Sequence, residues 1–333
     1  LIGGLFANAG EAWEFLAFQR RVSGDTFSAS NVSYTTSGIP NNLATKLAET
    51  MSIKDFGHAV SNVANLKLCS FEVGALVNTY GYITEGDGGQ ATYLVQAAGT
   101  PFDGFGDHEL PNNNVAVLQT TDVVSVRQYG AGMVEYADDT DAFNAATLAS
   151  FPHTGNNDLS IRREIYVPAG DYRITGTVYV RKGQHLRGAG DGASRIHNSV
   201  TSTGRKCFHL GAGISTGSPV NDPGGLAPII SALHVEGGDT SGGTIYMAVA
   251  GAQARDLFLT SSGTAIEVAG GDTITSRCII DQGLTGLTIT GQNHIIDSCL
   301  FYSMNYGFRV LDFSYDIQVN NCHFEYGVYD DFS

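Results

Sequence analysis

The stretch Ser276-Arg277-Cys278-Ile279-Ile280 decides the fold, because its pattern recurs along the C-terminal part of the chain, at residues 255–259, 297–301 and 320–324. The central positions form a column that steps by 21, 21 and 23 residues: Leu257, Cys278, Cys299 and Cys322. A second column steps by 21, 21 and 20 residues: Ala265, Gly286, Gly307 and Gly327. Two independent columns with one shared period indicate a repeat architecture.

A period near 21 residues predicts a coil of about three short strands, each paired with its copy in the next coil at roughly 4.8 Å. Like residues then stack as ladders inside the solenoid, where a cysteine acts as a small hydrophobic side chain. A leucine-rich repeat has a similar length, but its Asn and Leu consensus is absent here. The repeat therefore predicts an all-β fold, a parallel β-helix.

Composition and charge limit the classes of function. The 333 residues include 42 Gly and 8 Pro, and only 15% are charged, which argues against charge-driven disorder and collagen. The net charge of −15 argues against a nucleic-acid partner, because phosphate contacts need clustered Lys and Arg. It fits a neutral glycan, or an acidic glycan met through a local basic patch. No apolar stretch is long enough to predict membrane insertion.

Three regions are predicted along the chain. Residues 1–51 contain a short helix at 1–21 and a Ser-, Thr- and Asn-rich linker, and are interpreted as an attachment region or, alternatively, a frayed terminus. Residues 52–122 form a small β domain with strands at 80–84, 91–95 and 115–118 and a turn at 85–90. Residues 123–333 form the β-helix, with a helix near 138–147 that covers its first coil. Asp138, Asp139 and Asp141 are interpreted as the cap and first turn of that helix rather than as a metal site.

The opening of the third region resembles a known family. Residues 126–146 resemble the first motif of pectate-lyase-like β-helix proteins, written DFGA…DDTxAIxxA, although Gln128-Tyr129 replaces Asp-Phe. Residues 165–174 and 185–196 match that family's continuation, VxVPxGxYxxxG…LxGxGxxxSxI. Residues 52–57 resemble the end of tailspike virion-anchor regions, and residues 62–120 are similar to a small domain of phage capsule depolymerases. Together these stretches cover most of residues 43–333 and identify the chain with bacteriophage tailspikes.

The resemblance implies a right-handed β-helix, assembled as a homotrimer on the virion after synthesis in the host cytoplasm. It implies that residues 1–51 bind other tail or baseplate proteins, and that the β-helix recognises and degrades a bacterial capsule or O-antigen. A terminal coil also needs a cap, so we expect the protein to continue beyond Ser333.

Carboxylates on outward positions are the candidate catalytic residues. Alternation along the strands puts the cysteine column inside and predicts an outward column of Thr260, Asp281, Tyr302 and Glu325. Asp281 and Glu325 lie two strands apart, roughly 9.6 Å, close to the separation of about 6.5–9.5 Å in inverting glycosidases. We predict these two as catalytic residues, with Tyr302 and His323 binding substrate. The alternative is an exposed acidic surface at the coil turns.

Other chemistries find no support in the sequence. HExxH and GxSxG motifs are absent, the nine histidines make no ligand pattern, and no metal or other cofactor is implied. The Gly-rich stretch 188–193 precedes a strand pattern rather than a helix, which argues against a dinucleotide site. A polysaccharide depolymerase is therefore predicted, a glycoside hydrolase in preference to a lyase. The alternatives are a non-cutting receptor-binding adhesin and a structural tail component.

Overall fold

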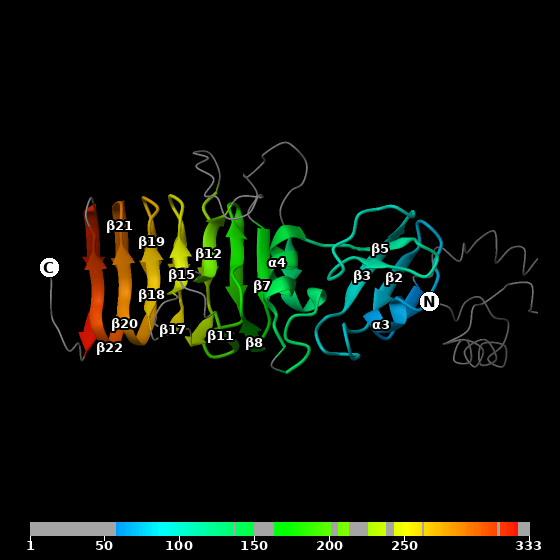
Figure 1. Ribbon diagram of the computed structural model, residues 1–333, viewed down its shortest axis with the longest axis horizontal. Coiled ribbons are helices and arrows are strands. Elements are labelled where there is room, and N and C mark those ends of the chain that lie inside the picture. The colour runs from blue at the N-terminus through cyan, green and yellow to red at the C-terminus, as the bar shows by residue number, and fades with distance from the viewer. Residues whose placement is uncertain are drawn as a thin grey trace, which may run out of the picture. The chain divides into compact units, whose positions relative to one another are not determined.

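The computed structural model describes residues 58–135, 137–149, 163–200, 206–212, 226–237, 243–261, 263–311 and 314–325 (Figure 1). The predictions for residues 1–51, and the Gly327 position of the second column, lie outside these residues. Within them the chain is an all-β, right-handed solenoid preceded by a small β domain, as the sequence predicts.

The small β domain is a five-stranded sheet with strand order β1-β2-β3-β5-β4, accompanied by one short helix. Strands β1 and β2 are parallel, and the other pairs are antiparallel. Val77, Tyr93 and Ala116 are fully buried and form the centre of its core. The elements are β1 His58–Val60, α3 Val63–Leu66, β2 Leu76–Thr79, β3 Ala91–Gln96, β4 His108–Glu109 and β5 Val115–Leu118.

The predicted strand at residues 80–84 is wrong, because β2 ends at Thr79 and a loop follows. The Asp87 carboxylate organises that loop by accepting backbone hydrogen bonds at 2.8–3.1 Å from Tyr82, Ile83, Thr84 and Gly89. Partial burial alone would raise the pKa of Asp87, but these four donors together hold it below its usual value. The Asp87 carboxylate thus accepts the backbone hydrogen bonds that a neighbouring strand would accept in a sheet.

The β-helix consists of two parallel sheets that share each coil. A coil crosses the first sheet once and the second sheet twice, and in the last coils the two crossings of the second sheet merge into the long strands β20 and β22. The first sheet contains β6 Val123–Ser125, β7 Arg163–Val167, β10 Gln184–Gly188, β13 Ile229–Ser231, β16 Gln253–Arg255, β19 Ile274–Ser276, β21 Gln292–Asp297 and β23 Tyr315–Asn320. The second contains β8 Gly170–Ile174, β9 Val178–Arg181, β11 Ser194–Asn198, β12 Lys206–Ala212, β14 His234–Gly237, β15 Gly243–Met247, β17 Phe258–Thr260, β18 Thr264–Val268, β20 Ile279–Ile289, β22 Leu300–Val310 and β24 His323–Glu325.

The predicted repeat corresponds to strand register. Strand β20 pairs with β22 so that Ile279 faces Leu300, and with β18 so that Ile266 faces Leu287, which aligns both columns. Leu257, Cys278 and Cys299 are buried, which confirms the inward position of the first column. All five cysteines of the chain are free thiols. Phe324 also keeps the register but is 39% exposed, since no described strand pairs beyond β24.

A left-handed backbone residue turns the chain from the first sheet into the second in successive coils. Asp256, Arg277, Ser298 and Asn321 have φ values between 52° and 56°. Asp and Asn tolerate this conformation better than most residues. Arg277 is held there by a bidentate ion pair with Asp256 of the preceding coil, at 2.6 and 2.8 Å.

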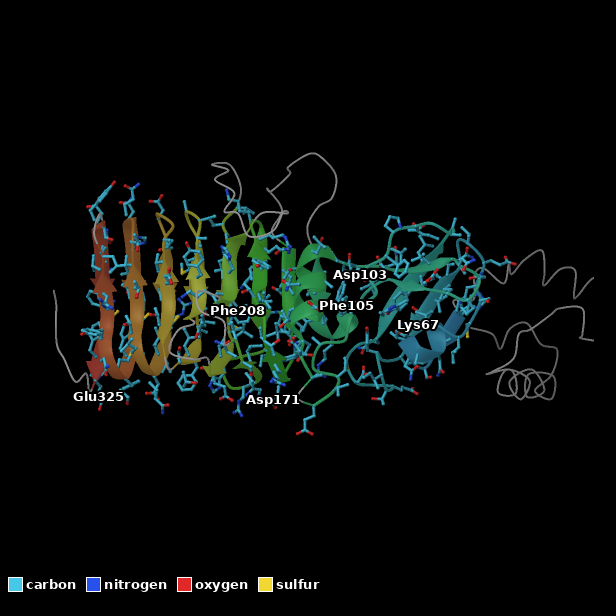
Figure 2. All side chains as sticks on the ribbon, viewed as in Figure 1. Lys67, Asp103, Phe105, Asp171, Phe208 and Glu325 are labelled. Carbon is cyan, nitrogen blue, oxygen red and sulfur yellow. The ribbon has the colours of Figure 1, made fainter. Side chains whose placement is uncertain are left out.

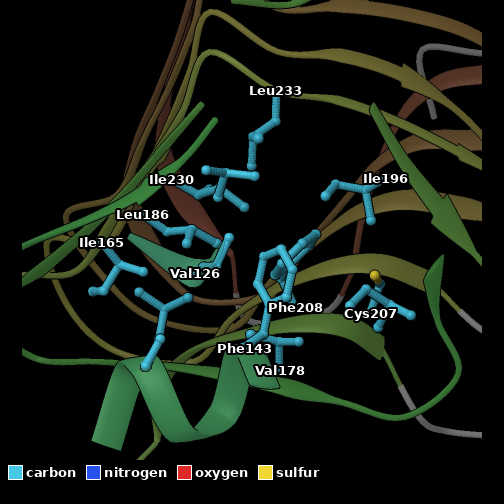
Figure 3. Close-up of a cluster of buried hydrophobic side chains, with 14 of the residues drawn as sticks. Val126, Phe143, Ile165, Val178, Leu186, Ile196, Cys207, Phe208, Ile230 and Leu233 are labelled. Carbon is cyan, nitrogen blue, oxygen red and sulfur yellow. The ribbon is translucent and has the colours of Figure 1, made fainter. Parts of the chain in front are cut away.

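Helix α4 (Thr140–Ala149) packs over the first coil, after β6 and the short helix η3 (Val126–Tyr129). Its Phe143 is fully buried and meets Tyr172 edge to face at 5.6 Å, and Figure 3 shows Phe143 pointing into the core near Val178 and Phe208. Asp139 is at the N-cap position, where its carbonyl accepts the Phe143 N–H at 3.0 Å, while the Asp138 carboxylate before it accepts the Thr140 backbone N–H at 3.0 Å. The helix therefore covers the apolar interior at this end of the solenoid.

Arg127 connects three segments at the start of the β-helix. Its Nη1 donates to the carbonyl of Asp87 at 2.7 Å, its Nη2 to the carbonyl of Ala169 at 2.7 Å, and its Nε to the hydroxyl of Tyr172 at 3.3 Å. One guanidinium group thus joins a loop of the small domain to the turn between β7 and β8.

Candidate functional site

Two rows of outward-facing residues run across the β-helix, from β8 through β11, β14, β17, β20 and β22 to β24. In-register pairing defines both rows. The first row is Asp171, Arg195, His234, Phe258, Ile279, Leu300 and His323. The second row is Arg173, His197, Glu236, Thr260, Asp281, Tyr302 and Glu325. We call these two rows the outward strip.

The predicted site residues lie together at one end of this strip. Asp281 pairs with Tyr302, and Tyr302 pairs with Glu325, so the predicted column and its register are confirmed. His323 is in the adjacent row, with its Nε2 3.5 Å from Oε2 of Glu325 and its ring 6.3 Å from that of Tyr302. The catalytic and binding roles of these four residues remain predictions.

Local sequence explains why Asp281 faces outward. Cys278 and Ile280 are fully buried, so alternation along β20 turns Ile279 and Asp281 to the other side. The strand then bends at Gln282, whose φ is 59°, and at Gly283, where an added Cβ atom would lie 2.5 Å from the carbonyl oxygen of Ser261. Asp281 is consequently fixed at the last position before the bend.

The middle of the strip combines apolar and hydrogen-bonding side chains. Phe258, Ile279 and Leu300 of the first row are half-buried on the outer side of the sheet. Beside them, Thr260, Asp281 and Tyr302 of the second row offer hydroxyl and carboxylate groups. A pyranose ring has an apolar face and a polar rim, and this pairing of rows complements both.

The other end of the strip holds an ionisable cluster that the 21-residue period does not predict. The Nε2 of His197 lies 3.1 Å from Oδ1 of Asp171, and its Nδ1 lies 2.7 Å from Oε1 of Glu236. Figure 2 labels Asp171 and Glu325, which lie along the same edge of the ribbon. Steps of 24, 39 and 24 residues separate Asp171, Arg195, His234 and Phe258, so the 21-residue period did not reveal these positions. The alternation of outward and inward residues on either side of the buried Ile196 was the only sequence signal that Arg195 and His197 face outward.

Each ring nitrogen of His197 contacts a different carboxylate. A neutral imidazole donates through one nitrogen only, so His197 donates to both carboxylates when its ring is protonated. His234 is adjacent, and burial lowers its pKa although the nearby Glu236 acts in the opposite direction. The cluster therefore brings two imidazoles and one arginine into contact with two carboxylates.

A second outward face carries an aromatic ladder that the sequence analysis also missed. Tyr179, His209 and Tyr246 occupy successive coils on β9, β12 and β15, with ring centroids 5.7 and 5.0 Å apart. Lys206 and Glu267 form an ion pair of 2.8 Å beside it. Ladders of this kind stabilise stacked coils through aromatic contacts.

Within the described ranges, no group of three or more His, Cys, Asp or Glu residues is arranged to hold a metal ion. In the same ranges, no helix has the length and apolar character needed to cross a membrane.

Solved structures with the same fold include phage tailspikes. The tailspike protein gp49 of Acinetobacter baumannii bacteriophage Fri1, a capsular polysaccharide depolymerase, matches with a TM-score of 0.54 and 14% identity, over 80% of this chain and 62% of that one. Tailspike protein 2 of bacteriophage CBA120 matches with a TM-score of 0.45 and 14% identity, over 86% of this chain and 55% of that one. The mannuronan C-5 epimerase AlgE6 A-module of Azotobacter vinelandii matches with a TM-score of 0.48 and 15% identity, over 61% and 56%. This chain thus spans less than two thirds of the length of these structures.

The search of curated proteins gave no match. The model of one protein family, described as rhamnogalacturonase A/epimerase, pectate lyase-like, matches residues 123–329, from β6 to beyond the last described strand. That range covers more than half of the chain and contains the described coils of the solenoid and the whole outward strip. The chain therefore belongs to the rhamnogalacturonase A/epimerase, pectate lyase-like family.

Proposed function

We propose that this protein is a phage tailspike that recognises and degrades a bacterial surface polysaccharide, either a capsule or an O-antigen. The capsular polysaccharide depolymerase gp49 shares its fold. Fold alone does not give function, so the proposal depends on the outward strip. We further propose a homotrimer on the virion, made in the host cytoplasm and attached to other tail proteins through residues 1–51.

One observation carries the proposed activity: Asp281 and Glu325 flank Tyr302 in a single in-register row. Two inter-strand steps separate the two carboxylates by roughly 9.6 Å at the backbone. That spacing leaves room for a water molecule beside a glycosidic bond, as inverting hydrolysis requires. A glycan lying across the strands would place successive sugars over Glu325, Tyr302 and Asp281.

The reaction that we propose is hydrolysis. One carboxyl group protonates the oxygen of the leaving sugar, and the other carboxylate takes a proton from the water that attacks the anomeric carbon. The C–O bond to the leaving sugar breaks as the bond to the water oxygen forms. Tyr302 stacks on a sugar ring between the two groups, and His323 binds the sugar next to Glu325.

The test is incubation of the protein with purified capsule and O-antigen from candidate host strains, followed by mass spectrometry of the product ends. Asp281→Asn and Glu325→Gln should each lower the rate by at least about 100-fold, the usual contribution of a general acid or base. Asp272→Asn is the matched control, because Asp272 is an exposed turn residue hydrogen-bonded to Asn293. Full activity in both site variants would remove the assignment. Wild-type protein that binds polysaccharide without shortening it would identify an adhesin instead.

A further inference from the structure

The carboxylates of the outward strip are spread along its whole length. Asp171 belongs to the first row, and Glu236, Asp281 and Glu325 occupy alternate strands of the second row. The two arginines of these rows, Arg173 and Arg195, both lie at the β8 and β11 end. From β14 to β24 the two rows therefore contain three carboxylates and neither lysine nor arginine.

Two arginines in or beside the strip face carboxylates. The Nε of Arg195 lies 4.0 Å from Oδ1 of Asp171. In the turn that precedes β20, Arg277 makes its bidentate pair with Asp256 at 2.6 and 2.8 Å. Between β14 and β24, a negatively charged sugar would meet carboxylates with no lysine or arginine of the two rows beside it, and like charges at close range repel each other.

Polar groups at β14 suit a hydroxyl group. His234 is only 9% exposed, and its Nε2 is buried without a hydrogen-bond partner. This nitrogen lies 3.5 Å from Oε2 of Glu236, whose other oxygen contacts His197 at 2.7 Å. The Glu236 carboxylate is the partly exposed group here, and a sugar hydroxyl can donate to it. A uronate carboxylate only accepts and does not fit beside Glu236.

From these observations we infer that the outward strip takes a glycan whose sugars over β14 to β24 are uncharged, rather than a polyuronate. The inference rests on the proposed function, because it names the substrate class of the same site. It also selects hydrolysis over β-elimination. Elimination removes the C5 proton of a uronic acid and builds negative charge on its carboxylate, which an active site stabilises with positive charge or strong donors.

The experiment uses purified surface polysaccharides from candidate host strains, one set neutral and one set containing uronic acid. Each uronate polymer is also tested after reduction of its carboxyl groups to alcohols. Cutting is followed by new reducing ends, by product mass and by the ultraviolet absorbance of unsaturated uronic acid. Binding is measured in parallel with the Asp281→Asn variant on the same immobilised polysaccharides, at low and high salt.

We expect binding to neutral polysaccharide with little salt dependence, products that have gained water, and at least tenfold faster cutting of a carboxyl-reduced polymer than of its native form. Cutting of a native uronate polymer to unsaturated products, lost after carboxyl reduction, would overturn the inference and leave the depolymerase function intact. Binding to neutral polysaccharide without any cutting would support the inference and reject the proposed hydrolysis. Binding to uronate polymers alone, or to none of the polysaccharides, would reject the inference.

Discussion

Asp281 and Glu325 come from strands two steps apart in the β-helix, and each pairs in register with Tyr302 between them. The first lies just before the bend of β20, and the second ends β24. Because the strands between them are hydrogen-bonded, the separation of the two carboxylates is a property of the sheet and not of a loop. A rigid spacing is what acid–base chemistry on a glycosidic bond requires.

The ring of Tyr302 should contribute to binding more than to chemistry. Replacing it in Tyr302→Ala removes the aromatic face between the two carboxylates, and we expect KM to rise about 5- to 10-fold, equivalent to roughly 1 kcal/mol. Tyr302→Phe keeps the face and should retain most of the affinity. Steady-state kinetics on the cleaved polysaccharide measures both variants. Equal losses in kcat for Ala and Phe would instead assign a proton-transfer role to the hydroxyl.

Packing inside the repeat makes Gly286 sensitive to any side chain. An added Cβ would lie 2.3 Å from the carbonyl oxygen of Gly307 and 2.8 Å from Cδ1 of Phe301. Gly286→Ala should therefore destabilise the β-helix by about 1–3 kcal/mol, as overpacking does. Gly271→Ala is the control, since its nearest neighbour would be at 3.5 Å. Urea unfolding measures the stability of both variants. Equal urea midpoints for Gly286→Ala and Gly271→Ala would contradict the packing argument.

The three contacts of Arg127 predict a loss of stability on substitution. Arg127→Lys keeps the charge but supplies one nitrogen where three now donate, so at least one of the three acceptors loses its charged donor. We expect a loss of about 1–3 kcal/mol in the free energy of unfolding. Arg309→Lys is the control, because Arg309 is exposed and contacts only the ring of Tyr306 among the interactions described for it. An unchanged thermal unfolding midpoint in Arg127→Lys would show that the three hydrogen bonds of Arg127 do not contribute to stability.

His108 should make the small β domain sensitive to acid. It is 1% exposed beside Tyr82 and Tyr93, neither ring nitrogen has a hydrogen-bond partner, and burial lowers its pKa from 6.5 to about 4. The unfolded chain takes up a proton at His108 as the pH falls through about 6.5, whereas the folded domain does so only near pH 4. Stability is therefore complete above pH 6.5 and falls between 6.5 and 4, by up to about 3 kcal/mol.

Urea unfolding at a series of pH values checks this, with His108→Leu as the comparison. The variant should lose that part of the pH dependence, and the difference between the two proteins should grow as the pH decreases from 6.5 to 4. A constant difference across this range would mean that His108 is solvated or hydrogen-bonded in the folded domain.

The sequence by itself determined the fold of the C-terminal part and the site predicted there. Strand alternation has a period of two and the coils have a period of 21, so the inward position of Cys278 and the outward column of Asp281, Tyr302 and Glu325 followed from counting residues. Local sequence also located α4, because a capping aspartate and buried positions such as Phe143 follow helical rules.

Only the tertiary structure decided which residues of the earlier coils lie in the same strip as the predicted site. The coils from β8 to β17 differ in length, and strand pairing alone showed that Asp171, His197 and Glu236 continue the strip that holds Asp281. The strand predicted at residues 80–84 failed for a similar reason, because the Asp87 carboxylate satisfies backbone groups that the alternating pattern assigned to a sheet. Periodicity in the sequence shows whether a residue points into or out of the coil. Which residues are neighbours across coils of unequal length depends on the hydrogen-bond register between strands, and that register exists only once the chain has folded.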